Sequence, residues 1–280
     1  MTNDYTLQQT GLSMVELLVA LAISSFLILG ITQVYIDNKR NYMFQQSQAS
    51  NLDNSRFAVL MLDEILSKAG YRRAPDQGME DAFPHNNTTL SDQCAPFPQE
   101  AVITKLKDTS SVGFCMRYQP ATANEDLCDG NTTTLAKDEP FYYPAQNETI
   151  YLAIKYTPDD NEQGGTISCQ SNKGGNAELL NGIADMQVEF GSGFEMEKWL
   201  KDGAYKNAAD WQESDGVVRA VRYSVLTGSR PGQRDGDSLV FSQWLANTAS
   251  ESSRNRLEAR DSRNIYQAAI GSQAVRNMMP

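Results

Sequence analysis

GLSMVE, residues 11–16, stands directly before LLVALAISSFLILGITQVYI, a run of twenty uncharged residues at positions 17–36. The run contains no proline, so nothing in it interrupts a helix. Twenty helical residues span about 30 Å, which is the thickness of the hydrocarbon core of a bilayer. A helix also satisfies its own backbone hydrogen bonds in lipid. The stretch therefore predicts a membrane-spanning helix near the start of the sequence.

The helical pattern continues beyond the apolar run. Residues 37–69 contain neither proline nor glycine, and apolar side chains recur along them at helical spacing. Gly70 follows, with Lys68 in the last turn, which is a typical helix end. A helix over residues 12–69 would be about 87 Å long. Its amphipathic second half is suited to packing on a globular domain, and a coiled coil is the alternative.

The remainder of the sequence predicts a sheet. Prolines and a polar cluster at 85–88 mark residues 71–100 as loop. A short helix is expected at 195–201, and a polar segment between the third and fourth runs predicts a hairpin. Nine strand-like runs lie at 101–106, 112–118, 149–156, 166–169, 177–180, 183–190, 217–226, 239–244 and 264–270. We therefore expect an α+β fold in which the long helix packs on a mostly antiparallel sheet.

Charge is unevenly distributed along the chain, whose net charge is −11. Residues 76–215 carry 24 acids and 9 bases, a balance of −15, whereas residues 216–280 carry 5 acids and 9 arginines, a balance of +4. The acidic middle argues against nucleic-acid binding by the whole surface. We expect the arginine-rich end to close against the acidic middle, and contact with an acidic partner is the alternative.

Four cysteines, Cys94, Cys115, Cys128 and Cys169, all lie beyond the apolar run. An even number in an exported domain suggests disulfides, and four cysteines allow three pairings. The sequence favours Cys115–Cys128, which closes a short loop, together with Cys94–Cys169. No C-x-x-C pair is present, and His85 is the single histidine, so no zinc site is expected.

The sequence contains no catalytic motif of the G-x-S-x-G, H-E-x-x-H or phosphate-loop type. Acids at 159–162 suit calcium by composition, but we interpret them as an exposed hairpin tip. Residues 235–237 are expected to form a turn. Five aromatic residues are expected in the core or at its edge: Tyr142, Tyr143, Trp199, Trp211 and Trp244. We therefore predict no enzymatic activity, no metal and no cofactor.

Gly11, the apolar residue after it, Glu16 and the apolar run together resemble the class III signal of type IV pilins and of type II secretion pseudopilins. The resemblance implies that a prepilin peptidase cleaves between Gly11 and Leu12 and methylates the new N-terminus at Leu12. It also implies four segments. These are a leader (1–11), a membrane or filament-core half-helix (12–36), an amphipathic half-helix (37–70) and a periplasmic β-rich head (71–280).

Three further segments are similar to PilW-like minor pilins of type IV pili: 69–72, 209–211 before the strand at 217–226, and 276–277. The resemblance implies an inner-membrane protein with a cytoplasmic N-terminus that later enters a pilus. Its partners would be other minor pilins, the major pilin and the inner-membrane assembly platform. The bulky head favours the initiation or tip complex. In a filament, Glu16 of one subunit would pair with the Leu12 amine of another, which offsets desolvation and sets the register.

Two departures from the family leave alternatives open, and one is that Leu12 stands where phenylalanine is commonest. The leader has no lysine or arginine, whereas Lys39 and Arg40 follow the apolar run, so a count of positive charges predicts the reverse topology. The cleavage motif overrides that count. A type II secretion pseudopilin is the alternative within the class. A periplasmic binding or enzymatic domain on an uncleaved signal anchor is the alternative of another class.

Overall fold

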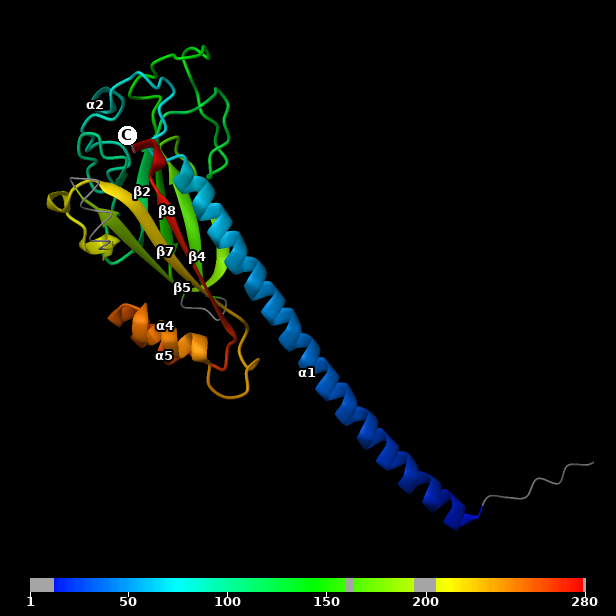
Figure 1. The fold of residues 1–280 in the computed structure, drawn as a ribbon. Coiled ribbons are helices and arrows are strands. Elements are labelled where there is room, and N and C mark those ends of the chain that lie inside the picture. The colour runs from blue at the N-terminus through cyan, green and yellow to red at the C-terminus, as the bar shows by residue number, and fades with distance from the viewer. Residues whose placement is uncertain (1–12, 160–163, 194–204, 279–280) are drawn as a thin grey trace, which may run out of the picture. The chain divides into compact units, whose positions relative to one another are not determined.

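The computed structural model describes residues 13–159, 164–193 and 205–278. The chain divides into two compact units that meet between Gln46 and Ser47. Helix α1, Met14–Ser67, includes residues of both units (Figure 1). The predicted long helix is therefore confirmed over the residues that are described.

The part of α1 in the first unit is exposed along its described length. Every side chain from residue 13 to residue 46 is exposed. The most apolar window of α1 has a mean hydropathy of 2.4, and none of it is buried. Within the described part of the chain, α1 alone is long and apolar enough to cross a bilayer.

The second unit is built on one antiparallel sheet, in the order β1-β2-β3-β4-β5-β7-β8, with β6 paired to β5. The α+β fold with a long N-terminal helix and an antiparallel sheet is thus confirmed. The strands are β1 Ile103–Thr104, β2 Val112–Tyr118, β3 Ile150–Thr157, β4 Gly165–Ser171, β5 Asn176–Ser192, β6 Tyr205–Asn207, β7 Val218–Gly228 and β8 Tyr266–Ala274.

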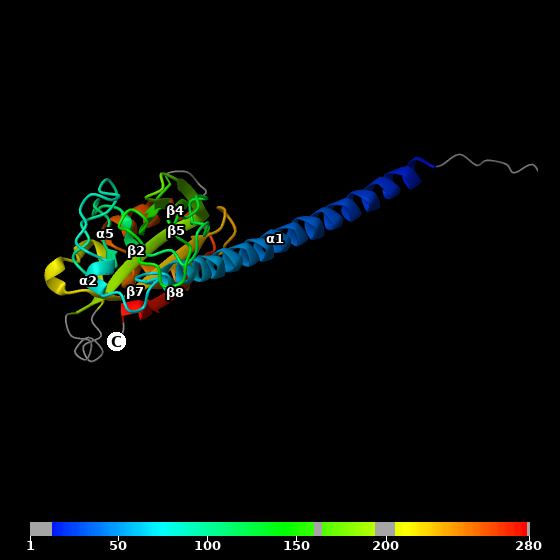
Figure 2. The ribbon, with the colours of Figure 1, turned by 90° about the horizontal axis from the view of Figure 1, so that it is seen from above.

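Helices cover both faces of this sheet (Figure 2). Because side chains alternate along a strand, Tyr223 and Val225 of β7 face the core with Leu62 of α1, while Leu226 faces the other side. There it packs against Phe241 and its neighbours. The helices on this second face are α4, Leu239–Asn247, and α5, Glu251–Arg260; the short α2, Met79–Ala82, lies in the loop before β1.

Residues 51–66 of α1 pack on the sheet, so the coiled-coil alternative is wrong for these residues. The C-terminal end of α1 lies close to where the sequence predicts it, just before Gly70. Gly70 has φ of +70°, and its N–H donates to the carbonyl of Arg117 at 3.0 Å. Asn277 Nδ2 donates to the carbonyl of Ala69 at 2.9 Å, which satisfies one of the free carbonyls at the helix end.

One predicted strand is wrong. Residues 239–244 form the start of α4, because Ser238 caps this helix by accepting from the Phe241 N–H, and Phe241 and Trp244 recur at helical spacing. A short apolar run alone does not separate a strand from a buried helix. The runs at 177–180 and 183–190 form one strand, β5. The helix expected at 195–201 lies outside the described residues.

Candidate functional site

The most unusual surface of the chain is the apolar segment of α1 at 17–36. Its large side chains are exposed, and Phe26 is 77% exposed. Such a contiguous apolar surface exceeds what a soluble monomer normally shows. Its exposure means that lipid or other helices must cover it when the protein is at work.

Glu16 directly precedes this segment, and its side chain bonds within its own helix. Its Oε2 accepts a hydrogen bond from the Ser13 N–H at 3.3 Å, and Ser13 Oγ accepts from the Val15 N–H at 3.3 Å. The Glu16 bond is the one that the glutamate makes in a capping box, while Ser13 Oγ accepts from the N2 rather than the N3 N–H, so both side chains satisfy free N–H groups at the helix start. The signal for this cap in the sequence is the S-x-x-E pattern at residues 13–16. Gly11 and Leu12 lie outside the described residues.

Polar contacts fix the second half of α1 to the sheet. Asn51 Nδ2 donates to the carbonyl of Ile265 at 2.8 Å, just before β8. Farther along the helix, Tyr223 Oη donates to Asp63 Oδ1 at 2.7 Å and to the carbonyl of Val59 at 3.1 Å. Burial, and then the adjacent Asp63 carboxylate, raise the pKa of Tyr223.

A buried carboxylate attaches α4 and α5 to the opposite face of the sheet. Asp185 of β5 accepts hydrogen bonds from Trp244 Nε1 at 2.9 Å, Ser253 Oγ at 2.9 Å and Arg256 Nη2 at 2.7 Å. A buried charge with this many partners is stable only while all of them remain in place. The cluster therefore holds the C-terminal helices in one arrangement.

Two arginines of the arginine-rich end bind acids of the acidic middle, in the direction that the charge pattern predicts. Arg256 pairs with Asp185, and Arg222 binds both carboxylate oxygens of Glu189, at 2.6 and 2.8 Å. The Arg222 guanidinium also lies 4.3 Å from the centre of the Tyr205 ring. These arginines are therefore occupied within the fold.

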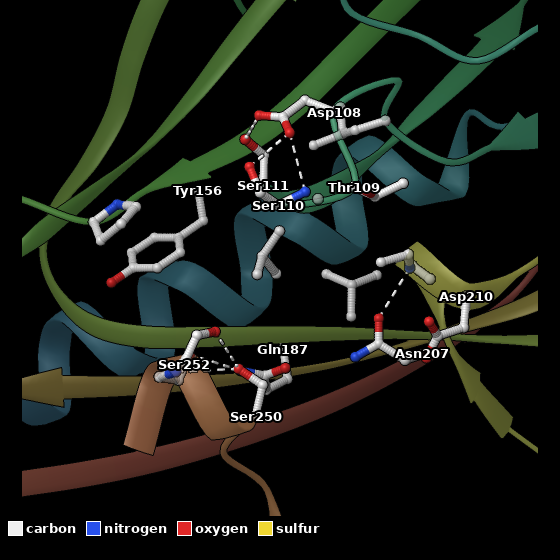
Figure 3. Close-up of a pocket in the computed structure, with 18 of the residues that line it drawn as sticks. Asp108, Thr109, Ser110, Ser111, Tyr156, Gln187, Asn207, Asp210, Ser250 and Ser252 are labelled. Carbon is white, nitrogen blue, oxygen red and sulfur yellow. Dashed lines mark hydrogen bonds between the residues drawn. The ribbon is translucent and has the colours of Figure 1, made fainter. Parts of the chain in front are cut away.

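A cavity of about 490 Å³ lies on the α5 side of the sheet (Figure 3). Gln187 and Asn207 line two of its sides, and Asp108 lies near its rim with Ser110 and Ser111. Hydrogen bonds from both serines lower the pKa of Asp108 to about 2, so this carboxylate is engaged by its own loop. Within the described ranges, no group of three His, Cys, Asp or Glu side chains is placed to hold a metal ion.

The four cysteines form two disulfides, but the favoured pairing is wrong. The bonds are Cys94–Cys115 and Cys128–Cys169, with Cα–Cα distances of 5.9 and 6.0 Å. Cys115 is opposite Ala153 on β3, whereas Cys169 is opposite the next residue, Ile154. Adjacent strand residues point to opposite faces, so Cys115 and Cys169 lie on different sides of the sheet and each pairs with a loop cysteine on its own side.

The structure confirms the predicted burial for two of the aromatic residues and not for a third. Trp211 and Trp244 are buried, as expected, whereas Tyr143 is 49% exposed. Gly236, in the turn expected at 235–237, has φ of +84°. Trp199 and most of the acidic tip at 159–162 lie outside the described residues.

No family model and no curated protein sequence matches the chain. Among solved structures, the chain is similar to a type IV-like pilin from Thermus thermophilus at 12% sequence identity and a TM-score of 0.44. That similarity covers 82% of this chain and 97% of the other. At this identity and score, it assigns neither a family nor a function.

Proposed function

We propose that the chain is a pilin-type subunit, namely a minor pilin that takes part in type IV pilus assembly in the initiation or tip complex. The observation that supports it most is α1 itself. Its first part exposes an uncharged apolar surface directly behind Glu16, and residues of its second part are fixed to the sheet by Tyr223 and Ile265. One helix thus carries both an unsatisfied apolar surface and a firmly attached head.

In this proposal the apolar segment stores the subunit in the inner membrane. Cleavage between Gly11 and Leu12 by a prepilin peptidase frees an amine, which is methylated at Leu12. Glu16 then exchanges its bond to the Ser13 N–H for a charge pair with the Leu12 amine of a neighbouring subunit. Because both charges leave water together, each offsets the desolvation of the other and the pair fixes the stagger between helices.

The two disulfides support an oxidising location for the head, because disulfides persist in the periplasm and are rare in the cytosol. The N-terminus is then cytoplasmic and the head periplasmic until the subunit enters the pilus. The partners are prepilin peptidase, the other minor pilins, the major pilin and the inner-membrane assembly platform. No enzymatic activity is assigned.

The test is the mass and N-terminal sequence of the protein from its native membrane, in cells with an active prepilin peptidase. A chain that starts at Leu12 and is heavier by one methyl group is the expected result. A chain that retains residues 1–11 contradicts the proposal and favours an anchored periplasmic domain. If the processed form is found, deletion separates the two pilin-type systems. Loss of pili indicates a minor pilin, and loss of secretion indicates a type II secretion pseudopilin.

A further inference from the structure

The two edges of the sheet differ in whether they are covered. At the β1 edge, residues 93–95 pair with residues 105–107, which follow β1. The Ala95 N–H donates to the carbonyl of Lys105 at 3.0 Å, and the Lys107 N–H donates to the carbonyl of Gln93 at 2.8 Å. At the other edge, no described strand pairs with the outer side of β8. An open edge presents a row of backbone donors and acceptors to any chain that approaches.

The backbone groups that β8 presents follow from its register with β7. Ser229 N–H donates to the carbonyl of Ile265, and Val275 N–H donates to the carbonyl of Arg219. Pairing is continuous between these points, without a bulge. In an antiparallel pair only every second residue bonds to the partner strand, so the odd-numbered residues of β8 bond to β7 and the even-numbered ones point outward. The backbone N–H and C=O groups of Ala268, Ile270 and Ser272, in the middle of β8, therefore point away from β7.

The segment has none of the usual features that prevent edge pairing. Residues 264–275 contain no charged residue and no proline, and Ile270 is 65% exposed. Ile270 also offers an exposed apolar side chain at this edge, against which a side chain of an added strand can pack.

The charges at the two ends of this segment indicate which kind of chain can pair with the β8 edge. Arg263 and Arg276 flank the uncharged stretch, both are exposed, and neither has an acidic partner among the described residues. A second copy is disfavoured. In an antiparallel pair of two β8 strands centred on Ile270, Ala274 falls opposite Tyr266, so the turn that carries Arg276 of one copy comes near the turn that carries Arg263 of the other. Like charges placed together across strands are destabilising.

We propose that the β8 edge binds an extended segment of a different protein, whose centre is uncharged and which carries acidic residues at both ends. The segment adds a strand through the outward groups of Ala268, Ile270 and Ser272. Its acidic ends pair with Arg263 and Arg276. This inference concerns the second unit alone and does not depend on cleavage of the chain or on the pilus.

The experiment uses the full chain in detergent micelles and hydrogen exchange resolved to single amides. The probe is a synthetic peptide as long as residues 263–276, with alternating threonine and valine in the centre and glutamate at both ends. The expected result is that the amides of Ala268, Ile270 and Ser272 exchange at least about tenfold more slowly with the peptide. The amides of Ala269 and Gly271 should not change, because they already bond to β7. The same peptide with lysine at both ends should give no slowing.

Three variants make the test specific. Ser272→Pro removes one outward N–H without touching the β7 bonds and should abolish the slowing, whereas Ser272→Ala should retain it. The double variant Arg263→Glu, Arg276→Glu should reverse the preference and favour the lysine peptide. Equal slowing by both peptides, or slowing by neither, overturns the proposal. Slowing without any peptide that grows with protein concentration also overturns it, because it indicates pairing between copies of this chain.

Discussion

Tyr223 Oη lies 2.7 Å from Asp63 Oδ1 and joins β7, the strand next to the sheet edge, to α1. The same hydroxyl donates to the carbonyl of Val59 at 3.1 Å. Its ring also crosses the neighbouring strand, since a Cβ added at Gly271 would lie 2.1 Å from Tyr223 Oη. One buried side chain on β7 therefore fixes the positions of a helix and of the edge strand.

Removing the hydroxyl with Tyr223→Phe should destabilise the second unit by about 1–2 kcal/mol, because a buried hydrogen bond is lost and Asp63 loses its donor. The measurement is urea unfolding of the full chain in micelles. Tyr143→Phe is the control. Its hydroxyl also bonds to a carboxylate, Asp76, at 2.5 Å, but its side chain is half exposed and water replaces the lost bond. Equal losses in the two variants would contradict the structural role of Tyr223.

The same contact predicts a dependence on alkaline pH. Burial and Asp63 raise the pKa of Tyr223 in the folded state, so the folded protein holds this proton more tightly than the unfolded chain. The resulting stability is complete below about pH 10, the ordinary tyrosine pKa, and is lost as the pH rises above it. The difference in unfolding free energy between the native protein and Tyr223→Phe should therefore shrink above pH 10. Unfolding curves at several pH values measure this, and a difference that stays constant would contradict it.

Gly271→Ala should disturb the fold through Tyr223, since the added methyl group takes the place of the phenol. Overpacking of this kind typically costs about 1–3 kcal/mol. Gly78→Ala is a suitable control, because the nearest atom to its added Cβ is 3.6 Å away. In Gly271→Ala, Tyr223→Leu the two effects should not add, since the ring that clashes is already absent. Additive losses would show that the clash is relieved elsewhere.

Replacing Arg117 should destabilise the fold more than replacing Tyr223 or Gly271. It is buried, and its guanidinium donates to the carbonyls of Ala101 at 2.7 Å, Pro84 at 2.7 Å and Pro98 at 2.9 Å, between the rings of Phe83 and Phe97. Burial lowers its pKa, yet it remains the donor on which the folding of this loop depends.

Arg117→Met fills a similar volume but leaves those carbonyls without donors, so the cost should reach about 3–5 kcal/mol. Limited proteolysis within residues 83–101 should accelerate in parallel. The exposed Arg230 provides the matched substitution, Arg230→Met, which should change stability by less than about 0.5 kcal/mol. A small effect of Arg117→Met on both measurements would show that water replaces the guanidinium.

The extent of prediction from sequence differs between elements for physical reasons. The sequence predicts helix α1 well, because residues 14–67 contain no proline and carry apolar side chains at helical spacing in the second half, and it predicts strand β2 with the bounds that the structure has. The sequence favours a strand over the first residues of α4, because the four apolar residues among 239–244 fit both periods and only the cap at Ser238 decides between them. The disulfide pairing depends on which face of the sheet Cys115 and Cys169 occupy, and that is set by strand register. The roles of Arg117 and Asp185 depend on partners distant in sequence, which no local pattern indicates.

Glu16 offers a prediction that separates its role in the helix cap from its charge. In the capping box the side chain only has to accept from the Ser13 N–H, and glutamine can do that as well as glutamate. Pairing with a Leu12 amine in an assembly requires the negative charge. Glu16→Gln should therefore preserve the helix start and cleavage, yet lose assembly as severely as Glu16→Ala.

The measurements for Glu16 are N-terminal processing, the level of the protein in the membrane, and surface pili counted by electron microscopy. Glu16→Asp is the control that retains the charge on a shorter side chain, and it should restore part of the assembly. If Glu16→Gln assembles normally while Glu16→Ala does not, capping accounts for the residue and the charge pair is wrong. If all three variants assemble normally, neither role is needed, and the apolar surface at 17–36 alone is sufficient to associate the helices.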